Sequence, residues 1–132
     1  MKTVLYVCVE NSNRSQMAEA FTRMHASDRV RAYSAGSRPS GAVNPRAIDA
    51  MREQGYDLGT HRSKSLDQVS PGPYDAVITM GCGDACPLVP AALREDWALP
   101  DPKGMEIAEL LRVRDEIERR VLDLIARLDR LG

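Results

Sequence analysis

An apolar run near the N-terminus passes within a few residues into a helix-forming stretch. The run TVLYVCV covers residues 3–9 and predicts a buried strand. The polar segment ENSN separates it from RSQMAEAFTRM, whose composition favours a helix. A strand that leads directly into a helix is the repeating unit of α/β proteins. The junction therefore predicts an α/β fold with this strand in its core.

The rest of the chain continues the alternation. The predicted elements are helices over residues 14–26 and 45–54, strands over 30–35 and 76–80, a short helix from about residue 65, and a long helix from about residue 105. Asn44 and Pro45 mark a helix start, and Gly55 marks its end. Residues 81–104 have little periodicity, and we expect a loop there. Regular alternation predicts a parallel, doubly wound sheet.

Length and charge limit the possible functions. The chain has 132 residues, which predicts one domain over residues 1–132 with a proper core. Its formal net charge of −1 argues against a general binder of nucleic acid or membrane surfaces. No apolar run approaches the ~18 residues that span a bilayer, and no signal peptide is visible. Three cysteines, an odd number, fit thiol chemistry in the reducing cytoplasm better than structural disulfides.

Cys8 stands where the first strand is predicted to end, and Arg14 follows after five residues. Loops that point backbone N–H groups inward and are closed by a helix N-terminus bind phosphate-sized oxyanions. The same positive environment favours the thiolate form of a cysteine. The guanidinium of Arg14 adds a planar set of donors for a tetrahedral dianion. Cys8 is therefore a candidate nucleophile for an oxyanion substrate.

The alternative is that Cys8 is a small apolar side chain of the core, and a C-x5-R spacing alone occurs by chance. Its context favours catalysis, because the junction lies at the carboxyl end of a strand, where open α/β sheets bind ligands. The loop is also rich in small polar side chains that can hold a tight turn. The predicted substrate-binding residues are Val9, Glu10, Asn11, Ser12, Asn13, Arg14 and Ser15.

Cys82 and Cys86 form a second chemical feature, in the segment GCGDACP that directly follows the last predicted strand. They are expected at the same sheet edge as Cys8. No further cysteine or well-placed histidine completes a four-ligand zinc site, so we expect no metal. The neighbouring glycines would give the backbone the freedom that thiol exchange requires. We interpret the pair as redox-active.

These segments together resemble the low-molecular-weight protein tyrosine phosphatase superfamily, and more closely the thioredoxin-coupled arsenate reductases that share its fold. The resemblance covers nearly the whole chain and is carried by CVENSNRSQMAEAF, SAGSRP, Asn44-Pro45, HRSK, TMGCGDACP and DWALPDP. It implies a four-stranded parallel sheet flanked by helices, in a cytoplasmic monomer without a cofactor. It also implies arsenate as the substrate and thioredoxin as the reductant.

The resemblance further implies a relay of three thiols. Cys8 would attack arsenate, and Cys82 would attack the resulting Cys8–arsenic adduct and release arsenite. Cys86 would then form a Cys82–Cys86 disulfide, which thioredoxin would reduce. Glutathione with glutaredoxin, or mycothiol, are alternative reductants. Asp101, in an Asp-Pro element, would act as general acid; a plain Asp-Pro turn is the structural alternative.

Several other residues have expected roles. Asp96 is a weaker candidate for the general acid. Trp97 is expected to pack the predicted loop over residues 81–104 against the rest of the domain. His25 and His61 are expected at the surface or as caps. The charged residues of the last helix, Arg114 among them, are expected on a solvated face.

Two positions depart from the family's pattern. Glu10 stands where many relatives have glycine, and its side chain is expected to turn out to solvent. Some of these reductases bind potassium beside the loop, and Lys64 stands about where they carry an aspartate. We therefore hypothesise that the Lys64 ammonium replaces the cation and contacts Glu19 or Asn11 directly.

Two other functions fit some of the same residues. A tyrosine phosphatase would use Cys8, Arg14 and Asp101 in the same roles. It would not need the other two cysteines, and Lys103 stands where such phosphatases commonly have an aromatic residue. A non-enzymatic arsenic or redox sensor would use the three thiols as ligands, but it would have no use for Arg14 or Asp101. The sequence favours the reductase.

Overall fold

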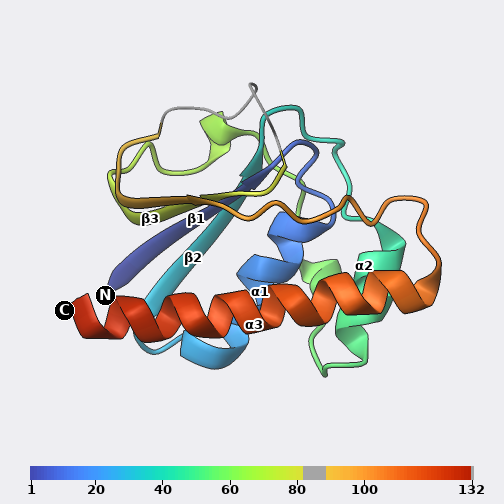
Figure 1. The fold of residues 1–132 in the computed structure, drawn as a ribbon. Helices are drawn as coiled ribbons and strands as arrows, with labels where there is room; N and C mark the ends of the chain where they lie inside the picture. Colours follow the sequence, from blue (N-terminus) through green and yellow to red (C-terminus); the bar gives the residue numbers. More distant parts are fainter. Residues whose placement is uncertain (82–88, 132) are drawn as a thin grey trace.

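A parallel sheet of four strands forms the centre of the computed structural model, which describes residues 1–81 and 89–131 (Figure 1). The strand order is β2-β1-β3-β4. The strands are β1 (Lys2–Cys8), β2 (Val30–Gly36), β3 (Tyr74–Thr79) and β4 (Ala91–Asp96). The helices are α1 (Arg14–Ala26), α2 (Pro45–Arg52) and α3 (Ile107–Leu131), with short 3-10 helices η1 (Leu58–Thr60) and η2 (Leu66–Gln68).

The chain winds outward from β1 in two directions. It passes first through α1 to β2 and later returns to β3 on the other side of β1. The register places Cys8 opposite Gly36 on one side and Val7 opposite Thr79 on the other. Strand order therefore reverses beside β1, which creates a crevice at the carboxyl ends of β1 and β3. The predicted doubly wound α/β fold is confirmed.

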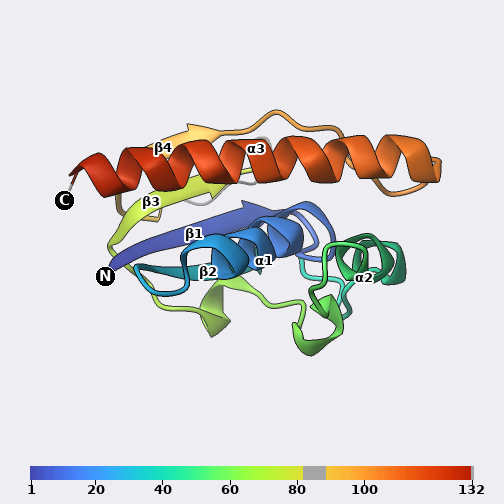
Figure 2. The same ribbon diagram turned by 90° about the horizontal axis from the view of Figure 1, so that it is seen from below.

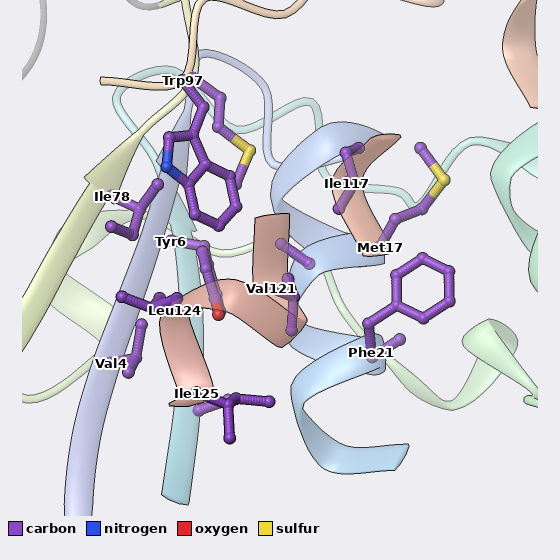
Figure 3. Packing of buried hydrophobic residues seen from close by; sticks show 14 of the residues in the cluster. Val4, Tyr6, Met17, Phe21, Ile78, Trp97, Ile117, Val121, Leu124 and Ile125 are labelled. Carbon is purple, nitrogen blue, oxygen red and sulfur yellow. The ribbon is translucent and has the colours of Figure 1, made fainter. Parts of the chain in front are cut away.

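Helices α1 and α3 lie side by side across one face of the sheet (Figure 2). Their apolar side chains, among them Phe21 and Ile117, meet those of β1 in one buried cluster (Figure 3). Trp97 joins this cluster at 4 % exposure, with its ring centroid 5.9 Å from that of Tyr6. Trp97 thus packs the segment that follows β4 (Ala91–Asp96) against the core, as expected. The opposite face of the sheet packs against Leu66, of η2, and its neighbours.

The strand β4 corrects the expectation of a loop over residues 81–104. Its sequence, AALRED, alternates half-buried and exposed positions because β4 lies at the edge of the sheet. Such a strand has one weak apolar stripe and several charges, so its periodicity is faint. Helix α3 begins two residues later than the expected start near residue 105, and its first residue, Ile107, is 56 % exposed.

Arg114 of α3 is buried, contrary to the expected solvated face. Its Nη1 donates to the backbone oxygen of Ala50 at 2.9 Å and to Glu53 Oε1 at 3.1 Å. The last carbonyl groups of a helix lack partners within it. The guanidinium therefore caps the end of α2 and anchors it to α3.

The N-terminus and the C-terminal end of α3 lie together at the end of the molecule where β1 begins (Figure 1). Within residues 1–81 and 89–131, no helix is both long enough and apolar enough to cross a membrane.

Candidate active site

A pocket of about 440 Å³ opens at the carboxyl ends of β1 and β3. It is lined by Cys8, Val9, Glu10, Ser12, Asn13, Arg14, Gly81, Leu99 and Asp101. The structure thus brings the candidate nucleophile, arginine and general acid to one place. Asp96 does not belong to this pocket. Its Oδ1 instead accepts a hydrogen bond from Thr79 Oγ1 at 2.7 Å.

Cys8 ends β1 at the base of the pocket, where it is 3 % exposed. Its Sγ lies 2.8 Å from Ser15 Oγ. The Ser15 oxygen accepts a hydrogen bond from Asn11 Nδ2, also at 2.8 Å. Because that bond uses a lone pair, the Ser15 proton is free to point at the sulfur. The Ser15 hydroxyl, in the first turn of α1, is thus positioned to donate a hydrogen bond to the Cys8 sulfur.

The loop after Cys8 is fixed by buried hydrogen bonds to Asn11. Asn11 has a φ of 51°, in the left-handed region. Its Oδ1 accepts hydrogen bonds from the Lys64 backbone N–H at 2.8 Å and from Gln16 Nε2 at 2.9 Å. These bonds offset the conformational cost of the left-handed backbone, which is about 1–3 kcal/mol for a non-glycine residue.

Gly36, at the end of β2, lies directly against the backbone of the same loop. A Cβ at this position would lie 2.6 Å from the Val9 oxygen and 3.0 Å from the Asn11 nitrogen. Both are backbone atoms, so no side-chain rotation relieves the contact. Residue 36 must be glycine for the loop to keep its shape.

Arg14 is the first residue of α1, and its side chain reaches across the pocket to the segment that follows β4. Its Nη1 donates to the Leu99 oxygen at 2.9 Å, and its Nη2 lies 3.9 Å from Asp101 Oδ2. Gly81 has a φ of 72°, and a Cβ there would approach Nη1 to 2.6 Å. Asp101 itself is about half exposed, and its Oδ1 accepts from the Lys103 N–H at 3.0 Å. Within residues 1–81 and 89–131, the guanidinium is therefore anchored by a hydrogen bond at Nη1 and lies at ion-pair distance from Asp101 through Nη2.

Glu10 does not simply turn out to solvent as expected. Its side chain is 36 % exposed, lines the pocket, and places Oε2 3.6 Å from Lys103 Nζ. The physical reason is that the loop after Asp101 places the Lys103 ammonium beside Glu10, at the rim of the pocket.

His61 is the main residue that the sequence interpretation misplaced. Its side chain is only 4 % exposed, and its Nδ1 lies 2.9 Å from Gln16 Oε1. Within the part of the chain that the structure describes, the partners of Gln16 Nε2 are acceptors, Asn11 Oδ1 among them. Gln16 Oε1 therefore accepts the proton of Nδ1. The Nε2 of His61 then accepts from Tyr56 O–H at 2.5 Å. A neutral His61 is satisfied on both nitrogens and supports the loop after Cys8 through Gln16, which donates to Asn11.

Glu19 is buried at 3 % exposure beside this network. Its Oε1 accepts from Ser34 Oγ at 2.5 Å, and its Oε2 pairs with Arg23 Nη2 at 2.6 Å. The Lys64 Nζ lies 3.9 Å from Glu19 Oε1, which confirms the expected contact. Across residues 1–81 and 89–131, no group of three or more His, Cys, Asp or Glu side chains could hold a metal ion.

The environment of His61 makes the stability of the folded protein depend on pH. Burial lowers the pKa of His61 below its ordinary value of 6.5, and the neighbouring charges of Arg23 and Lys64 lower it further. Glu19 and Asp57 act in the opposite direction but do not overcome burial. The folded protein therefore binds a proton at His61 less readily than the unfolded chain does.

We expect the free energy of unfolding to fall as the pH falls below 6.5, towards the lowered pKa of folded His61. The slope from this residue is at most about 1.4 kcal/mol per pH unit, because the unfolded chain takes up the extra proton. Urea unfolding at pH 7.5, 6.5 and 5.5 measures it. His61→Gln should flatten the dependence, because the glutamine side chain takes up no proton in this pH range. An unchanged slope in His61→Gln would refute the assignment.

Cys82 and Cys86 lie outside the described residues, so their positions relative to Cys8 are not part of the geometry above. Gly81, which precedes Cys82 in the sequence, is the last described residue of that segment and lines the pocket.

Known proteins are similar to this chain over most of its length. Residues 3–131 match the family "low molecular weight phosphotyrosine protein phosphatase". Arsenate reductase 2 of Staphylococcus epidermidis is 41 % identical over 124 residues, which cover 91 % of this chain and 93 % of that protein. The arsenate reductase of Staphylococcus xylosus is 43 % identical over 121 residues, or 89 % and 91 % of the two chains.

Solved structures give the same result. An arsenate reductase in the phosphate binding state is similar with a TM-score of 0.87 at 37 % identity, over 96 % of this chain and 98 % of the other. A thioredoxin-dependent arsenate reductase of Corynebacterium glutamicum has a TM-score of 0.83 at 30 % identity, over 100 % of this chain and 64 % of the other. The chain therefore belongs to the low molecular weight phosphotyrosine protein phosphatase family and, within it, to the arsenate reductases.

Proposed function

We propose that this protein reduces arsenate to arsenite for arsenic detoxification, with thioredoxin as the reductant. One observation carries the proposal: Cys8, Arg14 and Asp101 line a single pocket in a member of the arsenate reductases. Two further cysteines, Cys82 and Cys86, come shortly after Gly81 in the sequence, and Gly81 lines that pocket. They provide the reducing equivalents that a hydrolase does not need.

The first step is attack on arsenic by the Cys8 thiolate. The loop N–H groups and the Arg14 guanidinium hold the arsenate oxygens. A sulfur–arsenic bond forms while one arsenic–oxygen bond breaks. Asp101, which lies on the solvent side of the pocket, donates a proton so that the oxygen leaves as water.

The second step transfers two electrons to arsenic. The Cys82 thiolate attacks the Cys8 sulfur, a disulfide forms, and the electron pair of the sulfur–arsenic bond stays on arsenic. Arsenic is thereby reduced from the pentavalent to the trivalent state and leaves as arsenite. The Cys86 thiolate then attacks Cys82 and releases Cys8 as thiolate. Thioredoxin reduces the resulting Cys82–Cys86 disulfide through its own pair of thiols.

The setting follows from this chemistry. Three thiols that must be reduced between turnovers require a reducing compartment, so the protein acts in the cytoplasm. One domain, residues 1–132, carries the whole reaction as a monomer. The net charge of −1 gives it no general affinity for nucleic acid.

A second activity is favoured by a specific observation. Cys8, Arg14 and Asp101 are also sufficient to cleave a phosphate monoester through a phosphocysteine, and the matched family is one of phosphatases. We expect a weak phosphatase activity beside the reductase. A thiol-based sensor would not require a guanidinium and a carboxylate that meet in the pocket, and is disfavoured.

The test is arsenate-dependent oxidation of NADPH with thioredoxin and thioredoxin reductase, together with direct measurement of arsenite. We expect steady turnover with one arsenite per NADPH, because each arsenate consumes two electrons. Turnover only with glutathione and glutaredoxin would assign another reductant. Hydrolysis of 4-nitrophenyl phosphate without any arsenite would show that the protein is a phosphatase instead.

A further inference from the structure

Two ion pairs connect the same two segments across the pocket. The inner pair joins Arg14 to Asp101, and the side chain of Arg14 is only 8 % exposed. The outer pair joins Glu10 to Lys103, whose side chains are 36 % and 66 % exposed. Since Glu10 lines the pocket and exposure increases from the inner pair to the outer pair, the Glu10–Lys103 pair lies at the rim.

The direction of the reaction gives this rim a consequence. In an in-line displacement the leaving oxygen departs opposite the attacking atom. The sulfur of Cys8 is at the buried base of the pocket, so the leaving oxygen faces the rim, where Asp101 is half exposed. Arsenate releases only water there. A phosphate monoester must place the whole alcohol group at the rim, beside Glu10 and Lys103.

The charges at the rim also disfavour a phosphate monoester relative to arsenate. A lone carboxylate beside an oxyanion site would repel the substrate, but Lys103 lies within 4 Å of Glu10 and compensates its charge. The pair therefore obstructs the rim without adding a net negative charge to it. An uncharged aromatic alcohol would have to displace both hydrated groups.

We propose that Glu10 and Lys103 determine the substrate class: their ion pair admits small inorganic oxyanions and disfavours phosphate monoesters of bulky alcohols such as tyrosine, which keeps the phosphatase activity weak. The inference rests on the proposed function, since it concerns the same pocket. Exposed ion pairs contribute little to stability, about 0–1 kcal/mol, so variants of this pair should fold.

The test compares Glu10→Ala/Lys103→Ala with the wild type. We expect the ratio of kcat/KM for 4-nitrophenyl phosphate to kcat/KM for arsenate to rise at least about tenfold, or about 1.4 kcal/mol of selectivity. The matched control is Asp49→Ala/Arg52→Ala, an exposed ion pair on α2 with an N···O distance of 2.7 Å. The control should leave the ratio unchanged, and an equal rise in both variants would overturn the proposal.

The single variant Lys103→Ala separates charge from size. It leaves the Glu10 carboxylate uncompensated beside the anion site. We expect the KM for arsenate to rise severalfold, and the rise to shrink in high salt because the charge is solvent-exposed. A KM that is equal to that of the wild type at low salt would contradict the role assigned to Lys103.

A binding measurement distinguishes failure of this inference from failure of the reductase. Inorganic phosphate and phenyl phosphate are compared as protectants of Cys8 against iodoacetamide, with the Cys8 peptide followed by mass spectrometry. Only phosphate should protect the wild type well, whereas both should protect Glu10→Ala/Lys103→Ala. The same preference in both proteins would refute the rim proposal and leave arsenate turnover unaffected. A changed preference in a protein without arsenate turnover would refute only the reductase.

Discussion

Replacing Cys8 with serine is expected to abolish arsenate reduction and to lower any phosphatase activity by at least ~10³-fold. A serine hydroxyl fits the buried position beside Ser15 Oγ, but it is not ionised at neutral pH and cannot form the sulfur–arsenic bond. The NADPH assay measures the first activity, and 4-nitrophenyl phosphate measures the second. Retention of either activity in Cys8→Ser would remove the residue from the mechanism.

The other two cysteines should separate the two activities. Cys82→Ser and Cys86→Ser are both expected to lose steady arsenate turnover, while phosphatase activity requires neither thiol. Cys86→Ser should still release one arsenite per molecule and stop with a Cys8–Cys82 disulfide, which mass spectrometry detects as a loss of two hydrogens. Steady turnover of Cys86→Ser with thioredoxin would contradict the relay.

Arg14→Lys is the second large effect, with an expected fall in kcat/KM for arsenate of about 10²–10³-fold. The guanidinium donates to Leu99 with one nitrogen and keeps other donors for the oxyanion. A lysine ammonium is a single point charge and cannot serve both partners in this geometry.

The control for Arg14→Lys is Arg31→Lys, at an exposed position of β2 that should show no change. Thermal unfolding checks that both variants are folded. If Arg14→Lys keeps kcat/KM within about threefold of the wild type, the guanidinium does not hold the oxyanion through paired donors.

The elements that sequence predicted well carry strong local signals. The bounds of α1 agree residue for residue, because a buried strand, a polar loop and a helix former follow one another without interruption. The start of α2 follows from Asn44, whose side chain accepts the Arg46 N–H, and from Pro45. The strand β4 carries no such signal. Its existence depends on pairing with β3, a contact that local periodicity does not encode.

The site divides in the same way. Reactive side chains such as Cys8 and Arg14 could be proposed because their chemistry and spacing are visible in one segment. The groups that support them come from distant segments. Gly36 acts through an absent side chain, Leu99 through a carbonyl oxygen, and His61 through Gln16. Only the parallel register that sets Cys8 opposite Gly36 would have indicated the first of these.

The position of the chain ends has a practical consequence for immobilised or fused forms of the protein. The N-terminus and the end of α3 lie where β1 begins (Figure 1). The pocket is lined by Cys8, the last residue of β1, and so lies at the other end of that strand. A support or a fusion partner attached at either end would therefore face away from the pocket. Immobilised protein should accept oxyanions from the medium, which makes the fold suitable as the capture layer of an arsenate electrode.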